Sequence, residues 1–497
     1  MQTRARTRTL AELGLTVPGG SETRITGLSV DSRDVKDGHL FVALPGTKVH
    51  GAEFIQYALR MNARAILTDR AGAEIAADVL TADVPVVIAE DPRETLAFTA
   101  ALWFEAQPEV QVAVTGTNGK TSVASFTRQL WTEMGAEAIS LGTTGVEGAF
   151  SARLQHTTPE PITLHRALAQ AADAGVTHAA MEASSHGLAQ KRIDGVRLRA
   201  AGFTNLSQDH LDYHADFEDY FAAKAGLFAR VLPEDGTAVI NIDDAYGARM
   251  AEIAEDRGQD LLTVGRSSDA MLQILGQRYD ATGQELRFEW AGRIHQIRMG
   301  LIGGFQGENA LVAAGLCIGT GAEPQEVFDT LPMLETVRGR MQFAARRDNQ
   351  AAVFVDYAHT PQALETALKA IRPHVLGRLI VVFGAGGDRD QSKRPLMGRA
   401  AMEHADVVFV TDDNPRSEDP DLIRRQVIGG ITRGDYTEVG DRAEAILRAV
   451  DGLGAGDTLL IAGKGHETGQ EIGDTILPFD DVEQASVAVA ALDGKGL

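Results

Sequence analysis

The sequence has one cysteine, few aromatic residues and no long apolar run. Cys317 is the only cysteine among 497 residues, which excludes an intrachain disulfide and a zinc site built on cysteine. Aromatic residues make up 6% of the chain, whereas 52 residues are glycine, a mix that suits an α/β protein with tight turns better than an aromatic-rich β-sandwich. No segment approaches the ~18–20 consecutive apolar residues of a membrane helix, so we expect no membrane insertion.

Positive charge is also scarce. The chain has 47 Lys and Arg against 69 Asp and Glu, a formal net charge of −22. This argues against a nucleic-acid partner, because phosphate backbones need a positive face, but it permits small anionic ligands that need only a local site. At ~150 residues per domain the length predicts about three domains. Glu12 interrupts the N-terminal stretch before any apolar segment forms, so we expect no signal peptide and a cytoplasmic protein.

Short apolar runs alternate with helical segments along the whole chain. This pattern predicts a small α/β domain, a central parallel sheet covered on both faces, and a third, Rossmann-like α/β unit. We therefore expect domains at 1–90, 91–337 and 338–497. The expected strands are 25–30, 40–44, 65–67, 84–88, 110–114, 176–182, 200–204, 238–242, 352–356, 378–383, 406–411 and 457–462. The expected helices are 52–62, 92–106, 120–134, 361–372, 393–403, 420–430 and 441–450.

The strongest local motif is Thr115-Gly-Thr-Asn-Gly-Lys-Thr-Ser122, which links a predicted buried strand to a helix. Free backbone N–H groups and the positive end of the helix favour phosphate at such a junction. Lys120 can reach the β- and γ-phosphates, and the Thr121 hydroxyl can hold Mg²⁺. A strict P-loop has a glycine where Val114 stands, so the alternative is an ordinary glycine turn with a solvated lysine.

Two further segments follow central strands. Glu182 ends one strand and is suited to Mg²⁺, which prefers oxygen ligands, although Glu182 and His186 could instead form a capping network. Two histidines and two aspartates lie within residues 209–214, where they could bind metal or phosphate or form a structural cluster. Lys224 lies in an apolar context, where a lysine usually extends its ammonium to the surface.

In the third unit, four successive strand ends have polar loops that contain Gly, Asp, Arg or His. Carboxyl ends of parallel strands meet at one edge of a sheet, so this recurrence predicts a binding site there. The four loops are 356–361, 384–390, 412–416 and 463–467.

Together these segments resemble the Mur ligases across nearly the whole chain. The segments similar to family motifs, in the family's order, are Asp31-Ser-Arg33, Thr115–Thr121, His156-Thr-Thr-Pro159, Glu182–Leu188, Asn205–His214 and Asp356–Pro361. The resemblance implies an ATP-dependent amide ligase that adds meso-2,6-diaminopimelate to UDP-N-acetylmuramoyl-L-alanyl-D-glutamate through an acyl phosphate, in peptidoglycan precursor synthesis. It also implies ATP and Mg²⁺ as cofactors, a UDP-binding first domain, a central P-loop-type ATPase domain and an amino-acid-binding third domain. We expect a monomer.

The resemblance assigns roles by motif position. The catalytic residues it implies are Lys120, Glu182, His210 and Lys224, with Thr121, Glu182, His210 and the carbamate of an N6-carboxylated Lys224 serving Mg²⁺. The ATP-binding residues are Gly116, Thr117, Asn118, Gly119, Lys120, Thr121, Ser122, Asn309, Arg340, Asp356 and His359. The UDP-muramoyl-peptide residues are Val30, Ser32, Thr47, Lys48, Val49, Thr157, Thr158, Ser184, Gln190 and Arg192. The diaminopimelate residues are Arg389, Asp413, Asn414, Pro415, Arg416, Gly463 and Glu467.

One position departs from the family pattern. The family commonly has Phe-Asn-x-x-Asn near the adenine, whereas this chain has Phe305-Gln-Gly-Glu-Asn309. Gln306 keeps an amide but adds a methylene, so Asn309 is the firmer of the two adenine-side predictions.

The predicted selector of the amino acid is Arg416. A planar guanidinium grips the second carboxylate of diaminopimelate, which lysine lacks. If lysine left a buried Arg416 without an anion, the penalty of ~2–5 kcal/mol would give roughly 30- to several-thousand-fold discrimination. The alternative is that Arg416 forms a surface ion pair with Asp412 or Glu418.

Two other functions stay open at this point. The first is another ligase of the same superfamily, such as a folylpolyglutamate or UDP-muramate–alanine type, which residues 413–416 and the Ser32-containing first domain disfavour. The second is a P-loop NTPase that uses hydrolysis as a switch or motor. A ligase consumes ATP only when both of its other substrates are present, and this separates the two classes.

Overall fold

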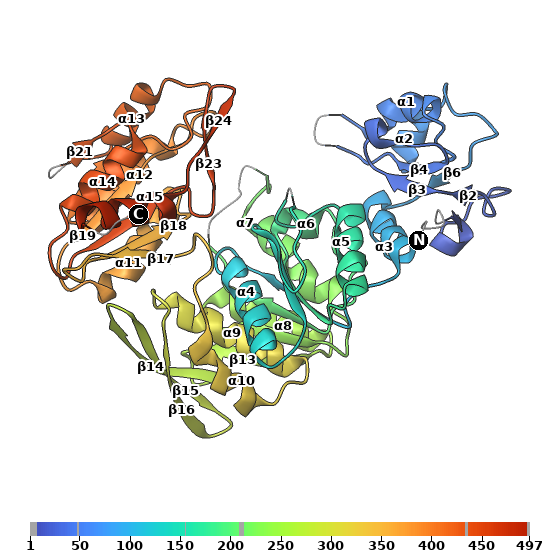
Figure 1. Ribbon diagram of the computed structural model, residues 1–497. Coiled ribbons are helices and arrows are strands. Elements are labelled where there is room, and N and C mark those ends of the chain that lie inside the picture. Colours follow the sequence, from blue (N-terminus) through green and yellow to red (C-terminus); the bar gives the residue numbers. More distant parts are fainter. Residues whose placement is uncertain (1–6, 47–48, 155, 208–212, 433–435, 495–497) are drawn as a thin grey trace. The chain divides into compact units, whose positions relative to one another are not determined.

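The computed structural model describes residues 7–46, 49–154, 156–207, 213–432 and 436–494 (Figure 1). The chain divides into two compact units: residues 1–264 with 312–327, and residues 265–311 with 328–497. No helix in these described ranges is long and apolar enough to cross a membrane. The boundaries expected at residues 90 and 337 stay predictions.

The first unit begins with a small four-stranded parallel sheet in the order β3-β4-β5-β6. Apolar clusters cover both faces of this sheet, as expected for parallel strands. Its strands are β3 (Gly27–Ser29), β4 (His39–Val42), β5 (Ala65–Thr68) and β6 (Val86–Ile88), and β1 (Arg8–Thr9) and β2 (Arg24–Ile25) form a separate antiparallel pair. The helices here are η3 (Gly51–Phe54), α1 (Ile55–Arg60), α2 (Arg70–Ile75) and α3 (Pro92–Phe104).

A larger sheet forms the centre of the first unit, where its strands run in the order β13-β12-β11-β7-β10-β8-β9. All of these pairings are parallel except β8 with β9. The strands are β7 (Val110–Thr115), β8 (Ala138–Gly142), β9 (Gly145–Gly148), β10 (His178–Glu182), β11 (Ala200–Phe203), β12 (Thr237–Asn241) and β13 (Asp260–Gly265). The helices are α4 (Lys120–Glu133), α5 (Pro161–Asp173), α6 (Ser185–Ala189), α7 (Phe217–Gly226) and α8 (Ala245–Asp256), and a π-helical turn (Leu227–Val231) follows α7.

The second unit contains a six-stranded sheet in the order β17-β18-β22-β19-β20-β21, parallel except at β17. Helices α11, α12 and α13 pack on one face, and α14 and α15 pack on the other. The strands are β17 (Gln342–Arg346), β18 (Ala352–Asp356), β19 (Leu379–Phe383), β20 (Val407–Val410), β21 (Tyr436–Glu438) and β22 (Thr458–Ala462). The helices are α11 (Pro361–Ile371), α12 (Lys393–His404), α13 (Pro420–Ile428), α14 (Arg442–Asp451) and α15 (Asp481–Leu492).

Other elements complete this unit. An antiparallel meander consists of β14 (Leu272–Asp280), β15 (Gly283–Trp290) and β16 (Arg293–Met299), and a hairpin pairs β23 (Gly469–Ile472) with β24 (Thr475–Pro478). Helices α9 (Phe305–Gly319) and α10 (Pro324–Thr330) lie on segments shared by the two units.

Several helices begin at a polar cap followed by proline. The Thr360 hydroxyl accepts from the N–H of Ala363 before Pro361, and Asp419 accepts from the N–H of Asp421 around Pro420. A proline at the first helical position lacks an N–H that would be unpaired there, so these pairs fix where the helix starts. The predicted helices 361–372 and 420–430 agree with α11 and α13 within two residues.

The prediction of an α/β protein with three main sheets is confirmed. Cys317 is buried in α9, as a small core residue, and burial raises the pKa of its thiol. One predicted strand, 25–30, is in fact two. It breaks at Thr26, so that Ile25 pairs with β1 while Gly27 begins the first parallel strand.

Candidate active site

The loop between β7 and α4 makes a tight turn that depends on two glycines. Gly116 has φ +147°, and a Cβ there would overlap the Thr204 hydroxyl oxygen. Gly119 has φ +88° and immediately precedes the first residue of α4. Only glycine adopts these conformations without strain, so the loop can bring its backbone close to a ligand. The N-terminus of α4, with its free N–H groups and positive dipole, then faces that loop.

The residues after β11 hold this loop in place. The N–H of Thr117 donates to the carbonyl of Asn205 (2.9 Å), and the N–H of Asn118 donates to the side-chain oxygen of Asn205 (3.0 Å). The Thr204 hydroxyl donates to the carbonyl of Asn118 (2.6 Å). Ser122, also predicted to serve ATP, is buried in the first turn of α4.

Two lysine ammonium groups meet at the carbonyl of Gly116. Lys120 Nζ donates to it (2.9 Å) and to the carbonyl of Thr117 (2.8 Å), while Lys224 Nζ donates to the same Gly116 oxygen from α7 (2.8 Å). Lys224 is 1% exposed, and its ammonium lies 4.6 Å from the centre of the Tyr220 ring. The usual case of a surface lysine, which the resemblance had already set aside for Lys224, does not hold here, because α7 packs this side chain against the loop.

Glu182 lies at the end of β10, one strand away from the loop. Its Oε2 accepts from the Thr121 hydroxyl (3.0 Å), and its Oε1 accepts from the N–H of Thr143 (2.8 Å). The side chain is 3% exposed, and a Cβ on Gly142 would overlap its Oε1. The carboxylate thus has one fixed position beside the first turn of α4.

The donor chemistry at Thr121 and Glu182 fits Mg²⁺. This ion usually binds one or two carboxylates, waters and substrate phosphates, and these residues offer a hydroxyl and a buried carboxylate. Within the described ranges no group of three or more His, Cys, Asp or Glu side chains is arranged to hold a metal. His210, the third protein ligand in the prediction, lies outside the described residues.

The predicted muramoyl-peptide residues of the central sheet form one connected group. The Thr158 hydroxyl donates to the carbonyl of Glu182 (2.9 Å) and accepts from the N–H of Ser184 (3.0 Å). Arg192 donates to the carbonyl of Thr158 (2.6 Å) and to the side-chain oxygen of Gln190 (2.8 Å from Nη2). Thr157 joins the group through its hydroxyl, which lies 3.1 Å from that of Thr143.

The predicted uridine residues belong to the small sheet. Val30 and Ser32 follow β3, where Asp31 caps a short 3₁₀ turn by accepting from the N–H of Arg33 (2.9 Å). Val49 is exposed after β4. Thr47 and Lys48, predicted for the same site, lie outside the described residues.

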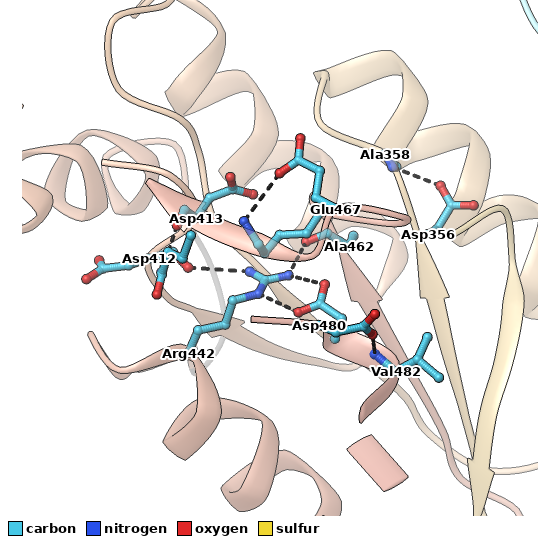
Figure 2. A network of polar contacts seen from close by, with 12 residues as sticks. Asp356, Ala358, Asp412, Asp413, Arg442, Ala462, Glu467, Asp480 and Val482 are labelled. Carbon is cyan, nitrogen blue, oxygen red and sulfur yellow. Dashed lines mark hydrogen bonds and ion pairs between the residues drawn. The ribbon is translucent and has the colours of Figure 1, made fainter. Parts of the chain in front are cut away.

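In the second unit, three of the predicted ATP residues lie close together at the end of β18. The guanidinium of Arg340 stacks on the Tyr357 ring at 5.0 Å, and His359 Nδ1 lies 2.8 Å from the carbonyl of Tyr357. Asp356 accepts from the backbone N–H of Met341 (2.7 Å). It also accepts from the N–H of Ala358 (2.9 Å), a contact drawn in Figure 2. Burial raises the pKa of the Asp356 carboxyl above its usual range, against the opposing effect of Arg340.

Asn309 and Gln306 face each other in the first turns of α9. Asn309 Nδ2 donates to Gln306 Oε1 (3.0 Å), and Gln306 is fully buried. Gln306 Nε2 has no hydrogen-bond partner among the described residues. A buried amide N–H₂ without a partner fits a ligand that offers an acceptor, such as a ring nitrogen of adenine.

The predicted amino-acid residues lie in the loops after β20 and β22, except Arg389, which lies in the loop after β19. Asn414 Nδ2 donates to Glu467 Oε2 (2.9 Å), and Asp413 and Asn414 are buried while Arg389 is exposed. Gly463 has φ +121°, and a Cβ there would overlap the Asp413 carboxylate. These contacts bring Asp413, Asn414, Gly463 and Glu467 together.

Arg416 pairs with neither of the acids considered from the sequence. Asp412 pairs with Arg424, and Glu418 pairs with Arg394. Arg416 Nε instead lies 2.5 Å from Glu471 Oε2, and its Nη1 donates to the carbonyl of Gly387 (3.0 Å). The prediction that lysine would leave Arg416 without an anion is therefore wrong, because Glu471 of the chain itself pairs with Arg416. The expected discrimination between diaminopimelate and lysine is correspondingly smaller.

Patterns of one family match most of the chain. The Mur ligase family pattern described as its catalytic domain matches residues 24–103, the Mur ligase middle domain matches 114–317, and the Mur ligase glutamate ligase domain matches 339–465. A UDP-N-acetylmuramoyl-L-alanyl-D-glutamate--2,6-diaminopimelate ligase from Bradyrhizobium diazoefficiens is 48% identical over 480 residues, which cover 95% of this chain and 96% of the relative.

The chain belongs to the Mur ligase family. A solved structure of a ligase of the same description has a TM-score of 0.73 and 34% identity, and the match covers 98% of this chain and 99% of that one. A folylpolyglutamate synthase of Mycobacterium tuberculosis shares the fold alone, with a TM-score of 0.61 at 20% identity over 81% of this chain and 95% of that one. As a Mur ligase, the protein is an ATP-dependent ligase, which removes the switch or motor NTPase from consideration.

Several contacting residues of this Mur ligase were not singled out by the sequence. The Tyr220 hydroxyl lies 3.1 Å from that of Thr117, and Thr143 holds Glu182. Lys464 and Glu471 contact Asn414, and only Lys464 had a signal, as a lysine between two glycines after a buried strand. The sequence alone does not indicate a role for Tyr220, Thr143 or Glu471, because each contacts a partner that is remote in sequence.

Proposed function

We propose that this Mur ligase joins meso-2,6-diaminopimelate to UDP-N-acetylmuramoyl-L-alanyl-D-glutamate at the expense of ATP, a step in peptidoglycan precursor synthesis. The relatives of the same description support this reaction. The observation that carries the choice of amino acid is the setting of Arg416. Its Nε and Nη1 have partners in Glu471 and Gly387, whereas no contact among the described residues occupies its Nη2, which can donate to a ligand carboxylate.

The reaction runs in two steps. A substrate carboxylate oxygen attacks the γ-phosphorus of ATP, the bond to ADP breaks, and an acyl phosphate forms. The amine of the incoming amino acid then attacks the acyl carbon, phosphate leaves from the tetrahedral intermediate, and the nitrogen loses a proton. No covalent nucleophile from the protein is needed, so its residues align the partners and neutralise charge.

This chain's residues divide that work. Lys120 leaves the Gly116 and Thr117 carbonyls for the phosphate oxygens, and the N–H groups at the start of α4 bind the same phosphates. Thr121, Glu182, His210 and a carbamate on Lys224 would hold Mg²⁺, which when bound adds positive charge beside the transferring phosphoryl group. Gln306 Nε2 and Asn309 would face the adenine.

Thr157, Thr158, Ser184, Gln190 and Arg192 would hold the muramoyl peptide, and Val30, Ser32, Thr47, Lys48 and Val49 would hold the uridine diphosphate. We also propose that the protein acts as a monomer. Because ATP and the uridine nucleotide are cytoplasmic metabolites, we place the reaction in the cytoplasm.

A phosphate-release assay tests the proposal. The enzyme, ATP and UDP-N-acetylmuramoyl-L-alanyl-D-glutamate are mixed with each amino acid in turn, and we expect turnover with meso-diaminopimelate and weak turnover with L-lysine. Phosphate release without an amino acid, or equal kcat/KM for the two amino acids, would contradict it.

Arg416→Ala should reduce the ratio of the two kcat/KM values by about 10- to 100-fold, an effect of ~1.4–2.8 kcal/mol. The estimate is smaller than that for an unpaired buried charge because Glu471 already neutralises Arg416. Arg425→Ala, an exposed arginine on α13, is the matched control and should leave the ratio unchanged. An Arg416→Ala enzyme with the wild-type ratio would show that this arginine is not the selector.

A further inference from the structure

Lys464 is a fully buried lysine that no proposed step uses. It follows β22 and lies between two glycines, and its ammonium donates to Asn414 Oδ1 (2.8 Å) and contacts Glu467 Oε2 (3.3 Å). A buried charge persists only where it is paired and hydrogen-bonded, and both partners of Lys464 belong to the proposed amino-acid site. The lysine therefore supports two residues of that site from the interior of the fold.

The contacts fix which way the Asn414 amide faces. Its Oδ1 receives Lys464 Nζ and the N–H of Glu471 (3.0 Å), and both of these groups are donors with no acceptor capacity. The atom that faces them must be the oxygen, whose two lone pairs are then used. The opposite side of the amide is Nδ2, which gives one hydrogen to Glu467 (2.9 Å) and keeps a second.

The consequence is a site with defined polarity. Asn414 can offer a ligand only a donor, which suits a carboxylate and repels an ammonium. Glu467 has its Oε2 engaged by Lys464 and Asn414, so its Oε1 is left for an ammonium. The two groups together match a ligand end that carries both a carboxylate and an ammonium.

The charge of Lys464 matters as much as its geometry. With Lys464, the pair that it forms with Glu467 is neutral, and without it the same position carries one negative charge. The distal end of diaminopimelate is itself neutral overall, since it carries one carboxylate and one ammonium, whereas that of lysine is positive. A neutral Lys464–Glu467 pair therefore favours diaminopimelate, and a negatively charged Glu467 alone favours lysine.

The backbone around Lys464 leaves it little freedom. Gly465 has φ +56°, and a Cβ there would lie 2.7 Å from the Cβ of Tyr357.

Figure 2 shows the guanidinium of Arg442 donating to the carbonyls of Asp412 (3.4 Å) and Ala462 (3.1 Å), where the loops after β20 and β22 begin. The buried pair of Arg442 with Asp481 (2.7 Å) holds that guanidinium in turn.

We propose that Lys464 is a positioning residue that sets the preference for an amino acid with a distal carboxylate over lysine. It acts through Asn414 and Glu467 by fixing the donor face of the amide and cancelling the charge of the carboxylate. This inference rests on the proposed function.

The test uses Lys464→Met in the full-length enzyme, with meso-diaminopimelate and L-lysine assayed in parallel. We expect the KM for diaminopimelate to rise about 10-fold or more, and the ratio of the two kcat/KM values to fall by a similar factor. The KM for ATP and the kcat at saturating diaminopimelate should stay within about twofold of wild type, a split that a general loss of structure would not produce. Lys369→Met, at an exposed lysine on α11, is the matched control.

Asn414→Asp provides a second variant that keeps the partner of Lys464. A carboxylate there presents an acceptor in place of the amide donor, so the preference should move toward lysine by at least tenfold. This result is expected even where Lys464→Met fails to fold, and thermal unfolding shows which variants have folded.

The outcomes separate the two proposals. A wild-type enzyme that fails to use diaminopimelate overturns the proposed function. A wild-type enzyme that prefers diaminopimelate, with folded variants whose preference stays within threefold of wild type, overturns the role of Lys464 and leaves the proposed function standing.

Discussion

The Thr121 hydroxyl donates a hydrogen bond to Glu182 Oε2 across 3.0 Å. Thr121 lies in the first turn of α4, and Glu182 is the last residue of β10, paired in register with Val114 of β7. The parallel pairing of these two strands thus sets the distance between a phosphate-binding loop and a carboxylate 61 residues further along the chain. A hydroxyl and a carboxylate in contact can both turn toward one cation when phosphate arrives.

Gly142→Ala should weaken this arrangement without touching either residue. A Cβ at position 142 would overlap Glu182 Oε1, so the carboxylate must leave the N–H of Thr143 and shift away from Thr121. We expect the Mg²⁺ concentration for half-maximal activity to rise about tenfold or more, in line with the effect of disturbing the groups that orient a metal ligand. Magnesium titration of phosphate release measures it.

The control for this variant is Gly276→Ala in β14. A Cβ there would meet nothing within 4 Å, and φ is not positive, so activity should not change. A Gly142→Ala enzyme with the wild-type magnesium dependence would show that the position of Glu182 does not govern the metal.

Lys120→Ala should reduce the turnover number by about 100-fold or more, because it deletes a preorganised cation beside the transferring phosphoryl group. In the structure the ammonium is bound by the carbonyls of Gly116 and Thr117, so its loss also frees the loop. Steady-state phosphate release with all three substrates tests this, and Lys36→Ala, at an exposed lysine of the first unit, should behave like wild type. Near-normal turnover with unchanged nucleotide affinity would reject the role of Lys120.

The parallel strands and their helices were predictable because local chemistry defines them. Val110–Thr115 is a largely apolar run before a glycine loop, and Leu379–Phe383 is a continuous apolar run, so each pattern predicts a strand buried on both faces. The meander of β14, β15 and β16 was not predicted. Its strands alternate buried apolar residues, such as Leu286 and Phe288, with charged and polar ones, so none of them is a continuous apolar run.

The candidate site was predictable where the signal lies within one loop. Lys120 and Thr121 follow a strand and start a helix, so their roles can be inferred from adjacent residues. Glu471 could not be inferred, since its importance arises from an antiparallel hairpin that brings it back to Arg416. The partner of Arg416 was misjudged for the same reason, because sequence distance favours Asp412 and Glu418 over a residue 55 positions away.

Lys224 should carry a carbamate in the active enzyme. A neutral amine adds CO₂ to form the carbamate with release of one proton, and the Lys224 side chain lies beside the phosphate-binding loop, where such a carbamate would meet the metal. The carbamate oxygens offer Mg²⁺ the anionic ligands that an ammonium cannot. A crystal of active enzyme grown with Mg²⁺ should show additional density on Nζ.

The same hypothesis predicts partial rescue of Lys224→Ala by acetate, since a free carboxylate can replace the missing one. Chloride at equal ionic strength is the control and should restore no activity. Bare lysine density in crystals that turn over substrate would reject the modification.

Acid should destabilise the first unit through His165. This residue is fully buried in α5, neither ring nitrogen has a partner among the described residues, and burial lowers the pKa of the imidazole to about 4. The unfolded chain, with an ordinary pKa near 6.5, takes up a proton that the folded chain refuses, so stability falls as the pH drops from about 6.5 toward 4. The loss at pH 5.0 is about 2 kcal/mol of unfolding free energy relative to pH 7.5.

Urea unfolding of wild type and His165→Leu at pH 7.5 and 5.0 isolates this contribution. The variant is expected to lose less stability than wild type between the two pH values, by about the same 2 kcal/mol. Equal losses in the two proteins would mean that His165 is protonated in the folded state or that other groups dominate.

The pairing of Arg442 with Asp481 also bears on how the protein is made. Asp481 is the first residue of α15, and its carboxylate holds the guanidinium that supports both amino-acid loops. Domains fold as units while the chain emerges from the ribosome, N-terminal parts first. A nascent chain that has reached residue 470 already carries the phosphate-binding loop, but the support of its amino-acid loops is still missing. We therefore expect the amino-acid site to be the last functional part to form during translation, only after α15 has emerged and docked.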